Sequence, residues 1–332
     1  MADAPDLVAS YFPPVVSRCI WHEVGVGFTG AKVWRGDFER NPDFALKRWP
    51  SGVTAEHLRQ LHYWMTTART AGCQFVPTVI QTVANDSVLS TSSRCWDVTT
   101  WMPGQADFHI RPTSEKLVSV CDAVARLHRA WFGRSIRSAP CPAVDRRLHL
   151  LDTWAGRRNS FDFTWLTVVN RAILTRSLTL VDERIASCRT SLRRWQTVSV
   201  PVFPCHCDLW HGNVLFEGEH VSAVIDYGAL KLDSPAVDLA RLLGDFVGPN
   251  SLQFDEIVNR YRSAKPPVDV PLELVRVLAE TGLVCALANW QLRLSNRVPP
   301  NVDQILNRLV CILSALTGEE MVTDGVGDSG LI

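Results

Sequence analysis

Strand-like patterning dominates the first hundred residues, with one clear change of period. Strand character marks four segments: Val24 to Trp34, Phe44 to Trp49, Val76 to Ser90 and Cys95 to Met102. Between them the period becomes helical over Thr54 to Ala71, where one face carries Leu58, Leu61, Met65 and Ala68. Thr54 is suited to cap the first turn. We therefore expect a β-sheet that is interrupted by a single helix.

The helical period takes over after Pro103-Gly104, which is the best candidate for a domain boundary. One face of the next helix carries Leu117, Val120, Val124, Leu127 and Trp131. Two long apolar helices are expected at Leu274 to Leu294 and at Ile305 to Leu316. A single hairpin interrupts them, with strands at Val214 to Phe216 and Val221 to Ile225.

These patterns predict an α+β fold of two lobes. We expect an N-terminal antiparallel sheet lobe over 1–103 and a mainly helical lobe over 104–318, with 133–200 as a helical insert. The ends, 1–10 and 319–332, are expected to be loose.

Composition narrows the class of protein. The chain has 332 residues, of which 46% are hydrophobic and 20% charged, so a disordered or fibrous chain is excluded. Its 34 basic and 34 acidic side chains cancel, although 133–200 carries 12 basic against 5 acidic residues. Because no global basic field exists, neither nucleic acid nor a membrane is an expected partner. The ten cysteines form no Cys-x-x-Cys pair, and no basic-then-apolar leader or long apolar run occurs, so we expect a cytoplasmic protein with reduced thiols.

Potentially catalytic residues surround the hairpin. His206-Cys-Asp208-Leu-Trp-His-Gly-Asn213 stands before it, and Ile225-Asp226-Tyr-Gly228 stands after it. Kinases use this order, with an Asn five positions after the Asp and an Asp-x-Gly one hairpin later. By that pattern Asp208 accepts the proton of an acceptor hydroxyl, while Asn213 and Asp226 hold the Mg²⁺ that bridges the phosphates of ATP. A zinc site made by His206, Cys207, Asp208 and His211 is the weaker alternative, because their spacing fits no zinc framework.

A glycine-rich segment lies upstream. Gly25-Val-Gly27-Phe-Thr-Gly30 fits Gly-x-Gly-x-x-Gly, which occurs in both dinucleotide-binding folds and kinases. A dinucleotide fold needs a helix directly after the glycines, whereas this chain continues as strand and then reaches Lys47 on another strand. The order strand, glycine turn, strand, lysine is that of a kinase, which covers ATP phosphates with backbone and pairs them with an ammonium. Glycines that serve only a tight hairpin remain the alternative.

Two further positions follow from the kinase pattern. Glu56 is the sole carboxylate between residues 44 and 85, so it is the candidate partner of Lys47, although an acid in a first helical turn is favoured in any case. The backbone of Thr100, Trp101 and Met102 is the candidate contact for the adenine edge.

The stretch after Asp226 separates the kinase classes. Only a dozen residues lead to Ser234-Pro-Ala-Val-Asp238-Leu-Ala, which leaves no room for a protein kinase's activation segment. At this point the chain resembles the aminoglycoside phosphotransferase and choline kinase-like family. The resemblance also uses Trp101-Met-Pro-Gly104 and Ala125-Arg-Leu-His128, and it covers about residues 20–245.

The resemblance implies a bilobal, protein-kinase-like fold that binds ATP and Mg²⁺ and phosphorylates a small molecule. It implies that Asp208 is the catalytic base, that Asn213 and Asp226 are metal ligands, that Lys47 pairs with phosphates, and that His206 and Asp238 brace the catalytic loop. The acceptor is open among aminoglycosides, choline or ethanolamine, homoserine and sugar-like hydroxyls. A nucleotide-binding regulator without strong catalysis is the alternative function. Trp210-His211 departs from the His-Pro common in the family and so affects the acceptor side.

Overall fold

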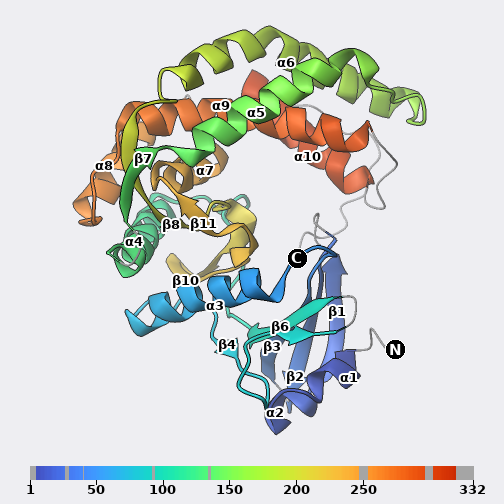
Figure 1. Ribbon diagram of the computed structural model, residues 1–332, viewed down its shortest axis with the longest axis vertical. Helices are drawn as coiled ribbons and strands as arrows, with labels where there is room; N and C mark the ends of the chain where they lie inside the picture. Colours follow the sequence, from blue (N-terminus) through green and yellow to red (C-terminus); the bar gives the residue numbers. More distant parts are fainter. Residues whose placement is uncertain are drawn as a thin grey trace. The chain divides into compact units, whose positions relative to one another are not determined.

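The computed structural model describes residues 5–26, 30–39, 41–91, 94–133, 136–246, 253–295 and 302–318 (Figure 1). The chain divides into two compact units. The first consists of Met1–Phe132 together with His211–Leu230, and the second of Gly133–Trp210 together with Lys231–Ile332. Helix α4 and the hairpin thus group with the N-terminal sheet, a division that differs from lobes that meet at Gly104.

An antiparallel sheet forms the centre of the first unit. Its strands run in the order β1-β2-β3-β6-β4, and β5 also pairs with β6. Their bounds are Ile20–Val26 (β1), Lys32–Phe38 (β2), Asn41–Arg48 (β3), Val79–Ile80 (β4), Leu89–Ser90 (β5) and Cys95–Thr100 (β6). The strand order confirms the kinase-like reading, because the chain continues as strand after Gly30 and not as helix.

The strand expected across Val76 to Ser90 is wrong for most of its length. Only β4 and β5 form at its ends. A turn separates them, in which the Thr82 amide donates to the Asp86 carbonyl at 2.8 Å and Asn85 takes a left-handed φ of 59°. The Asn and Asp residues of this segment favour a turn, and this preference outweighs the strand preference of its β-branched residues.

Residues 5–17 form regular structure, although the sequence predicts a loose end over 1–10. Val8 and Ala9 of α1 (Pro5–Ala9) and Val16 of α2 (Pro14–Ser17) are buried, and so is Phe12 between the two helices. These side chains form one core cluster with the sheet residues Trp34, Phe44, Leu46, Trp96 and Val98. The short helices therefore cover one face of the sheet, and their apolar burial offsets the entropy of ordering them.

Helix α3 (Ala55–Thr70) forms as the sequence predicts. The Thr54 hydroxyl caps it by accepting the His57 amide at 3.2 Å, and Leu58, Leu61, Met65 and Ala68 are all buried. Helix α4 (Ser114–Trp131) buries the expected apolar face and packs against β10. The hairpin of β9 (Val214–Glu217) and β10 (His220–Val224) also belongs to this unit.

The second unit combines a three-stranded antiparallel sheet with helices. The sheet order is β11-β8-β7, with bounds Arg137–Pro140 (β7), Ser199–Cys205 (β8) and Lys231–Asp233 (β11). The helices are α5 (Pro142–Arg157), α6 (Val168–Arg193), α7 (Ala236–Phe246), α8 (Gln253–Ser263), α9 (Leu272–Leu294) and α10 (Val302–Thr317), and a short 3₁₀ turn occurs at Arg158–Ser160. The 3₁₀ turns at His211–Asn213 and Tyr227–Ala229 belong to the first unit. Helix α9 packs against α5, α6, α7 and α10 (Figure 1).

Two further observations bear on the expectations from sequence. The insert 133–200 is mostly helical but begins with β7, which pairs with β8. Within the described parts of the chain, no helix is both long and apolar enough to cross a membrane.

Candidate active site

Lys47 and Asp226 meet in the first unit although 179 positions separate them in the chain. Lys47 Nζ lies 2.8 Å from Asp226 Oδ1. Lys47 comes from β3, and Asp226 follows β10 directly. The Lys47 side chain is 19% exposed, whereas the Asp226 side chain is 50% exposed, so the lysine is set into the protein and the carboxylate is open to solvent. The structure thus brings together two residues that the sequence assigned to phosphate and metal binding.

The backbone at Asp226 is unusual. Asp226 has a φ of 55° and a ψ of 68°, a left-handed conformation that non-glycine residues rarely adopt, and its carboxylate accepts the Gly228 amide. Asn213 immediately precedes β9, the other strand of the hairpin, and its carbonyl accepts the Ile225 amide at 2.9 Å. This bond ties Asn213 to the residue before Asp226. One amide and one carboxylate side chain are therefore carried at the same end of the hairpin, and their oxygen atoms are ligands that suit Mg²⁺.

The glycine-rich segment is described in part. Gly25 belongs to β1, where it pairs with Val33 beside a register shift. Gly30 has a φ of 82°, which a residue with a side chain would adopt only under strain. Gly27 lies outside the described residues. The assignment of Gly25, Gly27 and Gly30 to the nucleotide phosphates stays a prediction.

The hinge residues differ in the backbone groups that they can offer. The Thr100 amide donates to the Thr78 carbonyl and the Trp101 amide to the Asp43 carbonyl, each at 2.9 Å. Both N–H groups are therefore used within the first unit. Among the described residues, the Met102 amide has no such acceptor, which makes Met102 the residue of the three with an N–H for a ligand.

Glu56 does not pair with Lys47 in this structure. It lies exposed in the first turn of α3, and no ion pair joins these two side chains in the described part of the chain. The ammonium of Lys47 instead lies 4.0 Å from the ring centroid of Trp49, in addition to its contact with Asp226. The expected orienting role of Glu56 therefore has no geometric support here.

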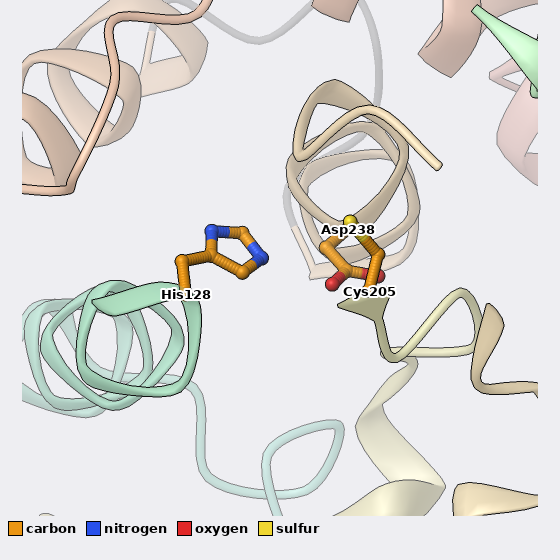
Figure 2. A group of neighbouring side chains, drawn as sticks. All are labelled: His128, Cys205 and Asp238. Carbon is orange, nitrogen blue, oxygen red and sulfur yellow. The ribbon is translucent and has the colours of Figure 1, made fainter. Parts of the chain in front are cut away.

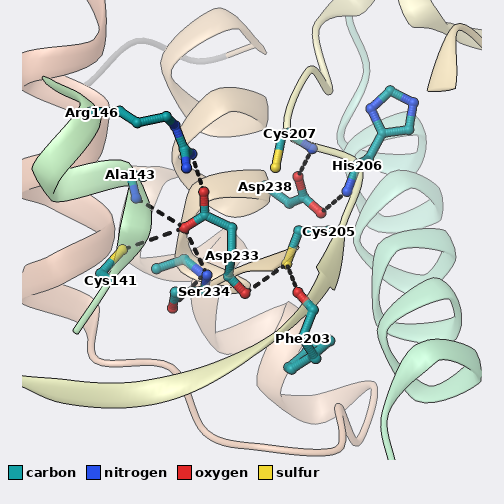
Figure 3. Close-up of polar contacts among 11 residues, drawn as sticks. Cys141, Ala143, Arg146, Phe203, Cys205, His206, Cys207, Asp233, Ser234 and Asp238 are labelled. Carbon is teal, nitrogen blue, oxygen red and sulfur yellow. Dashed lines mark hydrogen bonds and ion pairs between the residues drawn. The ribbon is translucent and has the colours of Figure 1, made fainter. Parts of the chain in front are cut away.

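The loop His206–Asp208, which the sequence predicts to be the catalytic loop, belongs to the second unit. Hydrogen bonds from its backbone amides hold it in place. Asp238 of α7 accepts the amides of His206 at 2.9 Å and Cys207 at 2.6 Å (Figure 3). Cys207 has a φ of 64°, so these two bonds hold a left-handed residue directly before Asp208. The Asp208 amide in turn donates to Nδ1 of the fully buried His206 at 3.3 Å. Asp238 and His206 thus have the bracing geometry that the family resemblance implies.

Two arginines that the sequence patterns did not identify lie beside this loop. Arg241, on α7 one helical turn after Asp238, places Nε 3.2 Å from Asp208 Oδ1. Arg308 of α10 lies over the Trp210 ring, with Cζ 4.6 Å from the centroid. The i, i+3 spacing of Asp238 and Arg241 shows only that both lie on one side of the same helix, and it does not specify the contact with Asp208. No local pattern points to the contact between Arg308 and Trp210 either.

A buried polar cluster around Asp233 lies next to the loop His206–Asp208. Asp233 is fully buried and accepts N–H groups from Ala143, Ser234 and the Arg146 guanidinium (Figure 3). The Cys205 thiol donates to the Asp233 carbonyl at 3.3 Å. Burial raises the pKa of both Cys205 and Cys207 well above the ordinary thiol value, and nearby Asp238 raises it further. These thiols are therefore protonated at neutral pH.

Figure 2 shows three buried side chains that carry metal-type donor atoms. His128 comes from α4 of the first unit, and Cys205 and Asp238 come from β8 and α7 of the second. The Cys205 sulfur lies within 4.8 Å of an Asp238 carboxylate oxygen. In the described parts of the chain, the set His206, Cys207, Asp208 and His211 makes no three-ligand metal group. The zinc alternative thus gains no support.

The similarity of this chain to known proteins lies in its fold. Spectinomycin phosphotransferase, solved with ADP and spectinomycin, has a TM-score of 0.67 at 13% identity, over 91% of this chain and 93% of that one. An aminoglycoside phosphotransferase from Alicyclobacillus acidocaldarius has a TM-score of 0.57 at 18% identity, over 96% and 94%. A microcompartment-associated aminopropanol kinase has a TM-score of 0.59 at 13% identity, over 94% of each chain. No curated protein matches the sequence.

The family follows from the sequence match together with this fold. The model of the phosphotransferase enzyme family matches residues 21–271, which include Lys47, the catalytic loop, the hairpin and Asp238. The solved structures above share the protein-kinase-like architecture across nearly the whole chain. The chain therefore belongs to the phosphotransferase enzyme family, and it is a small-molecule phosphotransferase.

Proposed function

We propose that this enzyme transfers the γ-phosphoryl group of ATP to a hydroxyl group of a small molecule in a Mg²⁺-dependent reaction. The observation that carries the proposal is the 2.8 Å contact between Lys47 and Asp226. Phosphoryl transfer needs an ammonium on the phosphates and a carboxylate on the metal ion, close to each other. A lysine and an aspartate brought together over 179 positions meet that requirement.

The nucleotide donor has support from both the relatives and the hinge. Spectinomycin phosphotransferase is solved with ADP, and amicoumacin kinase, with a TM-score of 0.59 at 11% identity, is solved with AMP-PNP and Ca²⁺. In this chain the Met102 amide is the hinge N–H that can donate to an adenine ring nitrogen. Asn213 and Asp226 would hold Mg²⁺ through their side-chain oxygens, and the ion would supply positive charge to the phosphates.

The remaining chemistry is assigned to this chain's own residues. Asp208 accepts the proton of the acceptor's hydroxyl group while the oxygen of that hydroxyl bonds to the γ-phosphorus. The bond between the γ-phosphorus and the oxygen that bridges it to the β-phosphate breaks, and ADP is released. Arg241 Nε lies 3.2 Å from Oδ1 of Asp208 and orients this carboxylate in the scheme. Lys47 orients the phosphates, and the braces from Asp238 and His206 keep Asp208 in place.

The acceptor is a small molecule with a free hydroxyl group. We put aminoglycosides and small amino alcohols first among the candidates, with support from the relatives named for spectinomycin, amicoumacin and aminopropanol. Homoserine, choline, ethanolamine and simple sugars complete the set. Trp210, two positions after Asp208, and Arg308, whose guanidinium lies over the Trp210 ring, are our candidates for contacts with the acceptor.

The test is ADP release with Mg·ATP across a panel of these hydroxyl acceptors, with Asp208→Asn as the blank. We expect release that depends on one class of acceptor and falls by about 10² to 10⁴-fold in the variant. Mg·ATP affinity should stay within about twofold, because Asp208 is assigned to the proton and not to the nucleotide. Equal release from the wild type and the variant would remove Asp208 from this role. Tight Mg·ATP binding without transfer to any acceptor would favour a nucleotide-binding regulator.

A further inference from the structure

Trp49 lies on the same face of the sheet as Lys47. Two positions separate them, and side chains two apart on a strand point to the same side. The Trp49 amide continues the pairing of β3 by donating to the Cys95 carbonyl at 2.9 Å. Asp97 of β6 is the direct partner of Lys47 in the strand register and shares this face. The sheet therefore presents Lys47, Trp49 and Asp97 side by side, opposite the face that α1 and α2 cover.

The indole of Trp49 makes two different contacts with these neighbours. Its ring face carries the Lys47 ammonium, with Nζ 4.0 Å from the centroid. Its Nε1–H donates to Asp97 Oδ2 at 2.9 Å. A cation over an indole face is attracted to the ring, and the hydrogen bond fixes the rotation of that ring. Trp49 thus gives Lys47 a support whose orientation is set by Asp97.

Asp97 is anchored by helix α3. His62 Nε2 lies 2.9 Å from the same Asp97 oxygen, and the two side chains are each only 5% exposed. The second ring nitrogen of His62 lies 2.9 Å from the Ser87 hydroxyl. Because a buried carboxylate is costly unless its oxygens are hydrogen-bonded, this arrangement has little freedom to change. The position of α3 is therefore linked to Trp49 through His62 and Asp97.

Trp49 also touches the loop that carries Asp226. A Cβ added at Gly228 would lie 3.1 Å from the Trp49 ring and 3.3 Å from Asp226 Oδ1. Gly228 therefore lies against the ring, and its amide donates to Asp226. One indole thus contacts Lys47 on its face and the glycine next to the lysine's carboxylate partner.

We propose that Trp49 is the positioning residue for Lys47, in place of a glutamate on α3, and that α3 acts on this lysine through His62 and Asp97. The inference rests on the proposed function, since it assumes that Lys47 binds nucleotide phosphates. Glu56, which the kinase pattern nominates for this task, is exposed and has no ion pair with Lys47 in the described part of the chain. In this proposal the helix acts on the lysine through the contacts of His62, Asp97 and Trp49, of which His62 and Asp97 are buried, and not through an ion pair.

The test is a double-mutant cycle on Mg·ATP affinity, which needs no acceptor. The four proteins are the wild type, Trp49→Leu, Lys47→Met and the double variant, and the dissociation constant of Mg·ATP is measured by calorimetry. If Trp49 acts through Lys47, Trp49→Leu weakens binding by about 3- to 30-fold in the wild type. The same change costs less than about twofold in the Lys47→Met background, because the group that Trp49 positions is gone. Equal losses in both backgrounds overturn the proposal.

Three further variants help to interpret the result. Trp49→Phe retains a ring face but no N–H, so its affinity should lie closer to the wild type than that of Trp49→Leu; affinity no better than the leucine variant overturns the cation contact. Gln60→Ala, an exposed change on α3, is the matched control for the helix. A loss in Glu56→Gln larger than that in Trp49→Leu assigns the role to the helix carboxylate and overturns the proposal.

The outcomes for the two proposals are separable. Phosphotransfer that requires Asp208, combined with equal losses in the cycle, leaves the proposed function and removes the role of Trp49. A non-additive cycle without transfer to any acceptor supports the role of Trp49 in nucleotide binding and counts against the transfer reaction. A wild type that does not bind Mg·ATP overturns both.

Discussion

Arg241 Nε lies 3.2 Å from Oδ1 of Asp208, the residue assigned to proton transfer. The two side chains are 31% and 39% exposed, so this ion pair contributes little to stability. Its effect is geometric, because it restricts the rotation of a carboxylate that must meet a hydroxyl. Arg241 belongs to the same helix as Asp238, so α7 both braces the loop backbone and orients its acidic side chain.

Replacing Arg241 should therefore lower turnover and leave nucleotide binding intact. For Arg241→Gln we expect kcat to fall by about 10- to 100-fold, the cost of a small misplacement of a catalytic group. The Michaelis constant for ATP should change by less than about twofold. Steady-state kinetics measure both values, with Arg194→Gln on the exposed end of α6 as the control. A raised Michaelis constant with unchanged kcat would contradict the positioning role.

Asp226→Asn should weaken nucleotide binding only when metal is present. The change keeps the size of the side chain but removes the charge that meets Lys47 and that suits a divalent cation. We expect the dissociation constant of Mg·ATP to rise by about tenfold or more, a loss of at least about 1.4 kcal/mol. Affinity for ATP in EDTA should fall much less. Titration calorimetry with and without Mg²⁺ gives the comparison, and equal losses in both conditions would remove Asp226 as a metal ligand.

Gly104→Ala should destabilise the protein at the end of the hinge. Gly104 has a φ of 102°, and an added Cβ would lie 2.8 Å from the Phe216 carbonyl oxygen and against the Ser222 hydroxyl. The conformational strain alone costs about 1–3 kcal/mol, and the backbone clash adds to it. Urea unfolding measures the loss of stability.

The matched control for that change is Gly156→Ala. Gly156 lies inside α5 with no heavy atom within 4 Å of the added carbon, so alanine should stabilise the helix by about 0.5–1 kcal/mol. Similar effects at both positions would mean that neither the positive φ nor the clash governs Gly104.

Stability should fall in alkaline solution because of buried thiols. Burial raises the pKa of Cys285 from 9.0 to about 12. Below pH 9 the thiol is protonated in both states, and this contribution to stability is fully present. Between pH 9 and 12 the unfolded chain loses the proton and the folded one keeps it, so stability falls by about 1 kcal/mol per pH unit. Urea unfolding at pH 8, 9 and 10 measures the slope, and Cys285→Ala should make it shallower. An unchanged slope in that variant would contradict the assignment.

Local sequence patterns predicted much of the fold, because those elements depend on interactions between residues that are close in the chain. Helix α3 and its cap at Thr54 depend on side-chain spacing and on one hydrogen bond within a single turn. The hairpin and the order of strands before Lys47 likewise depend on neighbours in the chain. The loose end expected over 1–10 is wrong for residues 5–10, because the order there comes from packing Val8, Ala9 and the following Phe12 on a sheet formed by later parts of the chain.

The candidate site likewise has features that the sequence specifies and features that only tertiary packing specifies. The amino-acid sequence by itself determined which residues are the candidates for the chemistry, since Lys47, Asp208, Asn213 and Asp226 follow the order and spacing of the kinase pattern. Only the tertiary structure decided their partners: Lys47 lies on Trp49 and not beside Glu56, and Arg241 meets Asp208. The His62–Asp97 contact joins a helix to a strand 35 positions away. Contacts of this kind depend on which faces of separate elements pack together, and no periodicity within one element specifies that.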